Sequence, residues 1–226
     1  MSFDLKLNQR VMNSFLLRCI LPLMILSSSI VGAQQTTRYN LAELLKDNKF
    51  TVPPHQKIVP LSIDTSQGVS VTGIVWLKGV NFSTGSIDVD IRGKDVLQQS
   101  FVGITFHGID TVTHDEIYFR PFNFQSTDTL RRKHMLQYHS EPDYPWDRLR
   151  KEHPLVYESG VIAAPMPNDW FHAHIVVSTD DITVYVNHSA TASLKVKKLN
   201  SRNDGLIGLW SSALSGDFAN LVISKN

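Results

Sequence analysis

The stretch Gly85-Ser86-Ile87-Asp88-Val89-Asp90-Ile91-Arg92 alternates strictly between apolar and polar side chains after its first residue. In an extended strand, successive side chains point to opposite faces, so Ile87, Val89 and Ile91 form one apolar face. The polar residues between them form the opposite face. This stretch therefore predicts a β-strand that is buried on one side only.

The same period of two continues on both sides of this strand, in segments rich in β-branched and aromatic residues and separated by Gly, Asn and Asp. Many short strands at this spacing predict an antiparallel sandwich or barrel. One short helix is expected at residues 40–46, because Asn40 can cap it and Glu43 occupies the third helical position. The segments expected to form strands are 58–63, 71–80, 86–92, 101–107, 116–120, 134–139, 172–178, 183–187, 193–196, 207–211 and 218–224.

The composition of the 226-residue chain excludes several classes of protein. Lys and Arg total 22 against 21 Asp and Glu, a formal charge of +1, so the chain lacks the basic surplus expected of a protein that binds nucleic acid. A single cysteine excludes an internal disulfide framework. We therefore expect one β domain without nucleic-acid partners, and its oligomeric state stays open.

Residues 1–33 have the pattern of a secretory signal peptide. Lys6, Arg10 and Arg18 precede the apolar stretch 19–26, and Val31-Gly32-Ala33 fits a cleavage site. The expected location is periplasmic or secreted, with no membrane contact after cleavage. Lipidation of Cys19 and an uncleaved N-terminal anchor are the alternatives. Residues 34–57 would then form an N-terminal segment with the short helix, and 58–226 the β domain.

Polar and aromatic residues alternate along two of the expected strands. Glu116, Tyr118 and Arg120 share one face of the first, and Gln137 and His139 share one face of the second. A guanidinium group matches pairs of hydroxyl groups, and an aromatic ring matches the apolar face of a sugar. His139 is also a candidate general base, because the ordinary pKa of histidine lies near neutrality. A structural ion pair between Arg120 and Glu116 explains part of this pattern equally well.

The stretch 121–167 interrupts the strand pattern with six prolines. Long irregular segments in compact β domains are commonly functional. This one carries Tyr144, Trp146 and Arg148, and residues 146–152 are expected to form one or two helical turns. We therefore expect the segment to supply a binding loop.

Two other sets of side chains are weaker candidates, one for catalysis and one for metal binding. Asp88 and Asp90 share one face of a strand, as paired catalytic carboxylates would, but a half-solvated strand shows the same pattern. His172 and His174 could point together, although the chain has no HExxH pattern and no residue spacing typical of zinc sites. We expect no metal or cofactor, and a structural calcium ion held by loop oxygens stays open.

From about residue 73 to residue 223, the chain resembles the concanavalin A-like lectin/glucanase superfamily and, within it, the bacterial 3-keto-disaccharide hydrolase family. The resemblance implies a two-sheet antiparallel jelly roll, with Arg120 and Gln137 on the concave sheet where sugars bind. Met135 stands where that family has an acidic residue, which favours binding over hydrolysis. The segments that carry the resemblance are 85–91, 118–120, Gln137, 169–170, 184–187, 205–210 and 218–223.

Three hypotheses follow for the function. The first is a secreted domain that binds a glycan on its concave sheet. The second is a glycosidase that acts on 3-keto-sugars, with His139 or another group as its base. The third is a laminin-G-like module that binds proteins. The expected substrate contacts of the first are Tyr118, Arg120, Asn123, Gln137, Tyr138, Trp146 and Arg148.

Overall fold

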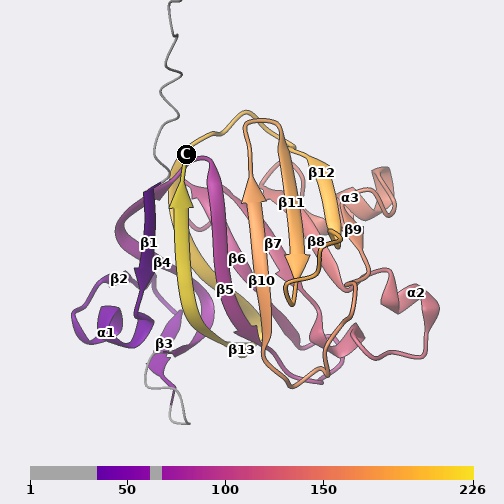
Figure 1. Ribbon diagram of the computed structural model, residues 1–226, viewed down its shortest axis with the longest axis horizontal. Helices are drawn as coiled ribbons and strands as arrows, with labels where there is room; N and C mark the ends of the chain where they lie inside the picture. The colour runs from indigo at the N-terminus through magenta and orange to yellow at the C-terminus, as the bar shows by residue number, and fades with distance from the viewer. Residues whose placement is uncertain (1–34, 62–67) are drawn as a thin grey trace, which may run out of the picture. The chain divides into compact units, whose positions relative to one another are not determined.

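A computed structural model describes residues 35–61 and 68–226 of the chain (Figure 1). The expected signal peptide lies outside the described residues, and so does the end of the strand expected at 58–63. Every pairing between the described strands is antiparallel, which confirms the all-β antiparallel fold class. The strands are β1 (Gln35–Tyr39), β2 (Phe50–Thr51), β3 (Lys57–Pro60), β4 (Val69–Phe82), β5 (Gly85–Arg92), β6 (Ser100–Gly108), β7 (His114–Phe119), β8 (Leu136–Glu141), β9 (Glu158–Ser159), β10 (Phe171–Val177), β11 (Asp181–Val186), β12 (Leu194–Lys197) and β13 (Gly205–Lys225).

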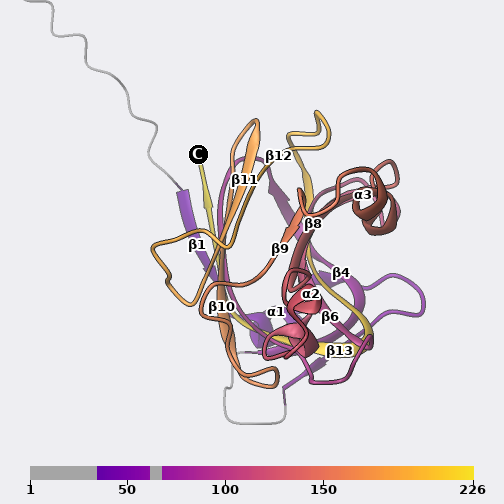
Figure 2. The same cartoon turned by 90° about the vertical axis from the view of Figure 1, so that its right-hand side faces the viewer.

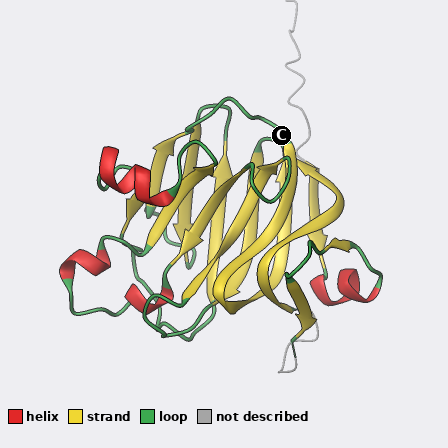
Figure 3. Ribbon diagram, turned by 180° about the vertical axis from the view of Figure 1, so that it is seen from behind, coloured by secondary structure: helices red, strands yellow, loops and turns green. Residues whose placement is uncertain are grey.

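The strands form two layers that face each other across the core (Figure 2). We call the layer made of β4, the first half of β13, β6, β7, β8 and β9 sheet I, which is seen from its outer side in Figure 3. Sheet II consists of β1, the second half of β13, β5, β10, β11 and β12. This arrangement is the sandwich predicted from the sequence.

Strand β13 belongs to both sheets. Its pairing with β4 shifts between Ser211 and Gly216, where the strand bulges and turns from one layer into the other. Strand β4 bends at the same level, because Gly73 pairs with Ser211 and has a φ of 83° that a residue with a Cβ rarely adopts. The sequence predicted two separate strands, 207–211 and 218–224, because the bulge interrupts the period of two without ending the strand.

The core lies between the sheets and follows the alternation read from the sequence. Ile87, Val89 and Ile91 are fully buried, as their places on the apolar face of β5 predict. Each such side chain contributes about 1.5–3 kcal/mol through its removal from water. Other fully buried members are Val102, Ile104, Phe106, Ile117, Phe119, Leu136, Ala173, Ile175, Val184, Leu209, Leu221 and many more of the same kind.

The helices lie at the margins of the sheets. Helix α1 (Leu41–Lys46) is confirmed, and its capping residue Asn40 accepts a hydrogen bond from the Glu43 amide at 3.2 Å. The segment between β7 and β8 forms a short 3₁₀ helix (Pro121–Asn123) and helix α2 (Thr129–Arg132), and helix α3 (Trp146–Glu152) follows β8. Among the described residues, no helix has the length and hydrophobicity needed to cross a bilayer.

Candidate functional site

A cavity of about 930 Å³ lies on the outer face of sheet I. Strands β4, β6, β7, β8 and β13 supply its floor, and helices α2 and α3 with the loops around residues 97 and 112 supply its walls. Its volume lies in the range of about 300–1,000 Å³ that is common for sites of small ligands. The lining residues are Ile74, Leu97, Gln98, Phe101, Thr111, Val112, His114, Glu116, Tyr118, Arg120, Phe122, Asn123, Arg131, His134, His139, Glu141, Trp146, Arg150, Trp210 and Ser212.

The alternation of β7 and β8 explains which side chains reach this cavity. His114, Glu116 and Tyr118 point to the same face of β7. The antiparallel register places Glu116 opposite His139, so groups from both strands meet at the floor. The polar face predicted for these two strands is therefore the face that carries the cavity.

Aromatic rings cover much of the floor and one wall. Phe101, Tyr118 and Trp210 are near neighbours, with ring centroids 6.1 Å apart for Phe101–Tyr118 and 5.4 Å for Tyr118–Trp210. Phe122 meets Phe101 edge to face at 5.4 Å. Trp146 on α3 keeps 47% of its surface exposed at the rim. The cavity therefore offers flat apolar surfaces both at its floor and at its rim.

Arg120 and Gln137 are neighbours in space, a relation that the sequence left open. The guanidinium Nη2 of Arg120 donates to Tyr118 Oη and to Gln137 Oε1, and Tyr118 Oη donates to Gln137 Oε1 at 2.9 Å. Nη1 donates to the His134 carbonyl at 3.1 Å. Arg120 is 95% buried, and its guanidinium group donates to partners within the protein. It therefore supports the floor of the cavity and does not present free donors to a ligand. Burial also lowers its pKa and raises that of Tyr118.

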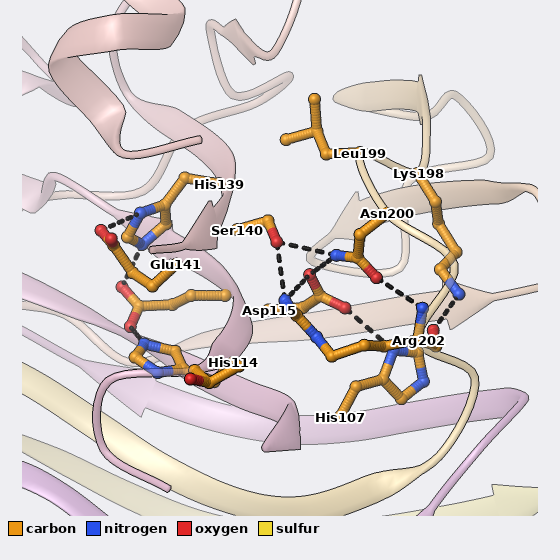
Figure 4. Close-up of polar contacts among 12 residues, drawn as sticks. His107, His114, Asp115, His139, Ser140, Glu141, Lys198, Leu199, Asn200 and Arg202 are labelled. Atoms are coloured by element: carbon orange, nitrogen blue, oxygen red, sulfur yellow. Dashed lines mark hydrogen bonds and ion pairs between the residues drawn. The ribbon is translucent and has the colours of Figure 1, made fainter. Parts of the chain in front are cut away.

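A second cluster at the floor joins two carboxylates to two imidazole rings (Figure 4). His139 lies between Glu116 and Glu141, with Nε2 3.1 Å from Glu116 Oε1 and Nδ1 3.2 Å from Glu141 Oε1. His114 Nε2 lies 3.5 Å from the other oxygen of Glu116. These are ion-pair contacts and not well-aligned hydrogen bonds, so both buried oxygens of Glu116 lack a hydrogen-bond donor in the described part of the chain.

The charge state of His139 follows from this environment. Burial lowers its pKa, but the charge of Glu116 and its contacts with Glu116 and Glu141 outweigh the burial and raise the pKa to about 9. Burial raises the pKa of Glu116, yet His139 and His114 bring it below its ordinary value. His139 is therefore protonated at neutral pH and suited to donate a proton. The general-base role expected of His139 from the sequence stays a prediction.

The structure separates the eight residues singled out from the sequence into two groups. Those that line the cavity are Tyr118, Arg120, Asn123, His139 and Trp146. Gln137 is fully buried because α3 covers it, and its Nε2 donates to the Trp146 carbonyl at 3.3 Å. Tyr138 points to the opposite face, where its hydroxyl donates to Asp115 Oδ1 at 3.2 Å. Arg148 lies on the exposed side of α3, paired with Glu152 at 2.9 Å. Gln137, Tyr138 and Arg148 are therefore not among the residues that line the cavity.

Several lining residues were not singled out from the sequence. Glu141 follows His139 by two positions and shares its face, so extending the alternation by one step would have found it. Trp210 belongs to a segment interpreted only as a marker of the fold. Arg131, His134 and Arg150 come from irregular or short helical segments where no strand period applies. Their sequence context gives no comparable signal.

The carboxylates of Asp88 and Asp90 lie away from this cavity, on the outer face of sheet II. Asp90 Oδ1 lies 2.8 Å from His172 Nδ1, and Asp88 Oδ1 lies 2.7 Å from His174 Nδ1. Contacts with these carboxylates raise the pKa of His172 to about 9 despite its partial burial. Within residues 35–61 and 68–226, no group of three or more His, Cys, Asp or Glu side chains is arranged to hold a metal ion.

The fold has solved counterparts. A Bacillus subtilis protein of unknown function, described as having a galectin-like fold, aligns over 86% of this chain and 96% of its own length, with 10% identity and a TM-score of 0.56. This chain shares that galectin-like fold. The carbohydrate-binding module CBM66 from Bacillus subtilis aligns over 76% and 92% (12% identity, TM-score 0.46). Domain 4 of an arabinanase from Geobacillus stearothermophilus, solved with arabinotriose, aligns over 84% and 82% (13% identity, TM-score 0.43).

At 10% identity, the likeness to the protein with the galectin-like fold bears on the fold alone. The sequence matches no protein-family model and no curated protein. The antiparallel two-sheet jelly roll is confirmed as a fold, and membership of the 3-keto-disaccharide hydrolase family stays a prediction.

Proposed function

We propose that the protein binds a carbohydrate in the cavity of sheet I. The observation that carries this proposal is the combination of flat aromatic surfaces with a polar floor in one cavity of about 930 Å³. Sugar rings have apolar faces that stack on aromatic side chains, and hydroxyl groups at their edges that need donors and acceptors. The carboxylate of Glu141, whose side chain is 27% exposed, is an acceptor of this kind at the floor.

The proposal includes the location of the protein. Strand β1 starts at Gln35, two residues after the expected cleavage point at Ala33, so cleavage there would leave every described residue in place. We propose that residues 1–33 direct export and that the remaining chain acts in the periplasm or outside the cell. A carbohydrate-binding protein in either place would meet polysaccharides directly.

The test of binding uses a glycan array followed by thermal unfolding with each retained glycan. A bound glycan is expected to stabilise the protein by about 2.7 kcal/mol at a hundredfold excess over its Kd. Replacing Trp146, which is half exposed at the rim, by alanine is expected to weaken binding about 5- to 30-fold, because truncating an aromatic contact commonly costs about 1–2 kcal/mol.

Trp170→Ala is the matched control for that variant. Trp170 stacks under Arg92, with 4.8 Å from Cζ to the ring centroid, and does not line the cavity. Its loss should leave glycan affinity unchanged. Equal losses in both variants, or no glycan retained from the array, would contradict the proposal.

Hydrolysis is a second candidate, favoured by the position of protonated His139 between two carboxylates. Glu116 and Glu141 contact opposite nitrogens of one imidazole ring. The distance between the two carboxylates therefore spans the imidazole ring and one contact on each side of it. Such a distance is closer to that between the carboxylates of inverting glycosidases (about 6.5–9.5 Å) than to that of retaining ones (about 5–5.5 Å). A 3-keto-glycoside is the substrate to try first, following the resemblance in the sequence.

Turnover of such a glycoside by the native protein should fall at least about a hundredfold in Glu116→Gln, since general acid–base groups contribute about 10²–10⁴-fold. Initial rates measured by product release would show it. Retained glycan binding without any turnover would reject hydrolysis and leave the binding function in place.

A further inference from the structure

Three arginines and one histidine gather at the end of the cavity formed by helices α2 and α3. Arg120, Arg131, Arg150 and His134 all line the cavity there. Glu116 and Glu141 pair instead with His139, and Glu116 also with His114. In the described part of the chain neither carboxylate forms an ion pair with these arginines, so the α2–α3 end of the cavity is its positive end.

A single carboxylate serves most of the cations at the positive end. Glu158 Oε2 lies 2.9 Å from Arg150 Nη2, 2.7 Å from His134 Nδ1 and 3.8 Å from Arg120 Nη1. Burial acts to raise the pKa of Glu158, but the contacts with Arg150 and His134 have the larger effect and bring the pKa below its ordinary value. This carboxylate is therefore ionised. Two guanidinium groups thus share one negative charge, and the ring of His134 contacts the same carboxylate.

Arg131 has no carboxylate partner among the described residues. Its Nε donates to Asn123 Oδ1 at 3.0 Å and its Nη2 donates to the Phe122 carbonyl at 2.8 Å. Both partners are neutral, so they orient the guanidinium toward the cavity without balancing its charge. The positive end of the cavity therefore carries more cationic charge than its own residues neutralise.

This surplus bears on the kind of saccharide that the cavity fits. A neutral sugar would displace water from the guanidinium groups and leave their charge uncompensated, which is costly in a partly closed site. A planar carboxylate instead accepts two parallel hydrogen bonds from a guanidinium group. Arg150 also lies over the ring of Trp146, 5.2 Å from Cζ to the centroid, so a charged donor and a stacking surface occur together.

We infer that the saccharide bound in this cavity is acidic, with a uronate carboxylate directed toward Arg131 at the α2–α3 end and neutral hydroxyl groups toward Glu116. The inference rests on the proposed carbohydrate function and names the class of its ligand. Anionic groups on sugars include carboxylates, sulfates and phosphates, and the planar pairing with arginine favours the carboxylate.

The experiment measures the affinity of the full protein by titration calorimetry for trisaccharides of galacturonate, glucuronate and mannuronate. Each is compared with its methyl ester, which keeps the shape and removes the charge. At least one uronate is expected to bind about tenfold or more tightly than its ester, and added salt should weaken the acid and not the ester. A sulfated trisaccharide forms a separate arm.

Arg131→Gln is the decisive variant and Arg132→Gln its matched control. Arg132 is the next residue of α2 and does not line the cavity. The ratio of acid to ester affinity should fall about tenfold in Arg131→Gln and stay unchanged in Arg132→Gln. This ratio separates charge recognition from local structure, because a variant that only disturbs the wall would weaken acid and ester alike.

Each other outcome has a distinct meaning. Equal binding of acid and ester, or an unchanged ratio in Arg131→Gln, would overturn the inference and leave carbohydrate binding standing. Tighter binding of the sulfated sugar would overturn the assignment to a carboxylate. Failure of every glycan to bind, neutral ones included, would overturn the proposed function and the inference with it.

Discussion

Replacing Asp115 by alanine is expected to destabilise the protein by about 3–5 kcal/mol, because it leaves buried cationic and polar groups without their acceptor. Asp115 lies on the core face of β7 and is fully buried. Its carboxylate contacts His107 Nδ1 at 2.9 Å and Arg202 Nη2 at 3.1 Å, and it accepts a hydrogen bond from Asn200 Nδ2 at 2.6 Å (Figure 4). Urea unfolding followed by tryptophan fluorescence measures the loss.

Asp181→Ala is the control for this variant. Asp181 pairs with Lys197 at 2.9 Å in an exposed position, so its loss should cost only about 0–1 kcal/mol. A loss of less than about 1 kcal/mol in Asp115→Ala would show that the buried network contributes little to the free energy of unfolding.

The same network predicts a dependence on pH. Burial raises the pKa of Asp115, but the hydrogen bond from His107 and the charge of Arg202 lower it further, so its folded pKa lies below the unfolded value of about 3.9. The stabilisation is therefore present above that unfolded pKa and is lost as the pH falls through the folded pKa. We expect the native protein to lose more stability below pH 4 than Asp115→Ala does.

The composition of the site face could be read from the sequence wherever strands supply it. Glu116, Tyr118 and Arg120 share a face by alternation alone, and the structure places all three at the cavity. Tyr138 alternates with Gln137, so the same period assigns it to the core face, where it lies. The alternation of side chains between two faces follows from the geometry of any strand, so the packing of the sheets does not change it.

Other features of the site depend on tertiary contacts, which the alternation along a strand does not predict. Gln137 is on the predicted face, but helix α3 closes over it and turns a predicted ligand contact into a buried support for Arg120. The pairing of Glu116 with His139 depends on the register of β7 against β8, which the intervening segment with α2 sets. Arg131 owes its orientation to Asn123, eight residues earlier at the end of the short 3₁₀ helix. None of these relations follows from local sequence.

The Glu116→Gln variant is expected to lower the pKa of His139 from about 9 to near or below the ordinary value of about 6.5. Burial acts to lower that pKa, and the charge of Glu116 is the largest influence that raises it. Glu141, whose side chain is 27% exposed, stays in place and provides weaker support for the proton.

NMR titration of the histidine ring protons measures this shift, with the His139→Gln variant used to assign the signal. His172 provides an internal control, because Asp88 and Asp90 raise its pKa to about 9 in sheet II, and Glu116→Gln leaves those contacts untouched. The two histidines should titrate together in the native protein and separately in the variant. A His139 signal that still titrates near pH 9 in the variant would show that Glu116 does not hold its proton.

The contact between His139 and Glu116 also makes the stability of the protein depend on pH, in the direction opposite to that expected for Asp115. Because the folded pKa of His139 is raised, the stabilisation is fully present below the unfolded pKa of about 6.5 and is lost as the pH rises through about 9. The native protein should therefore lose stability between these values, and Glu116→Gln should lose less. A protonated imidazole at the floor is also what a proton-donating role would need, so this titration and the turnover measurement test the same feature by independent means.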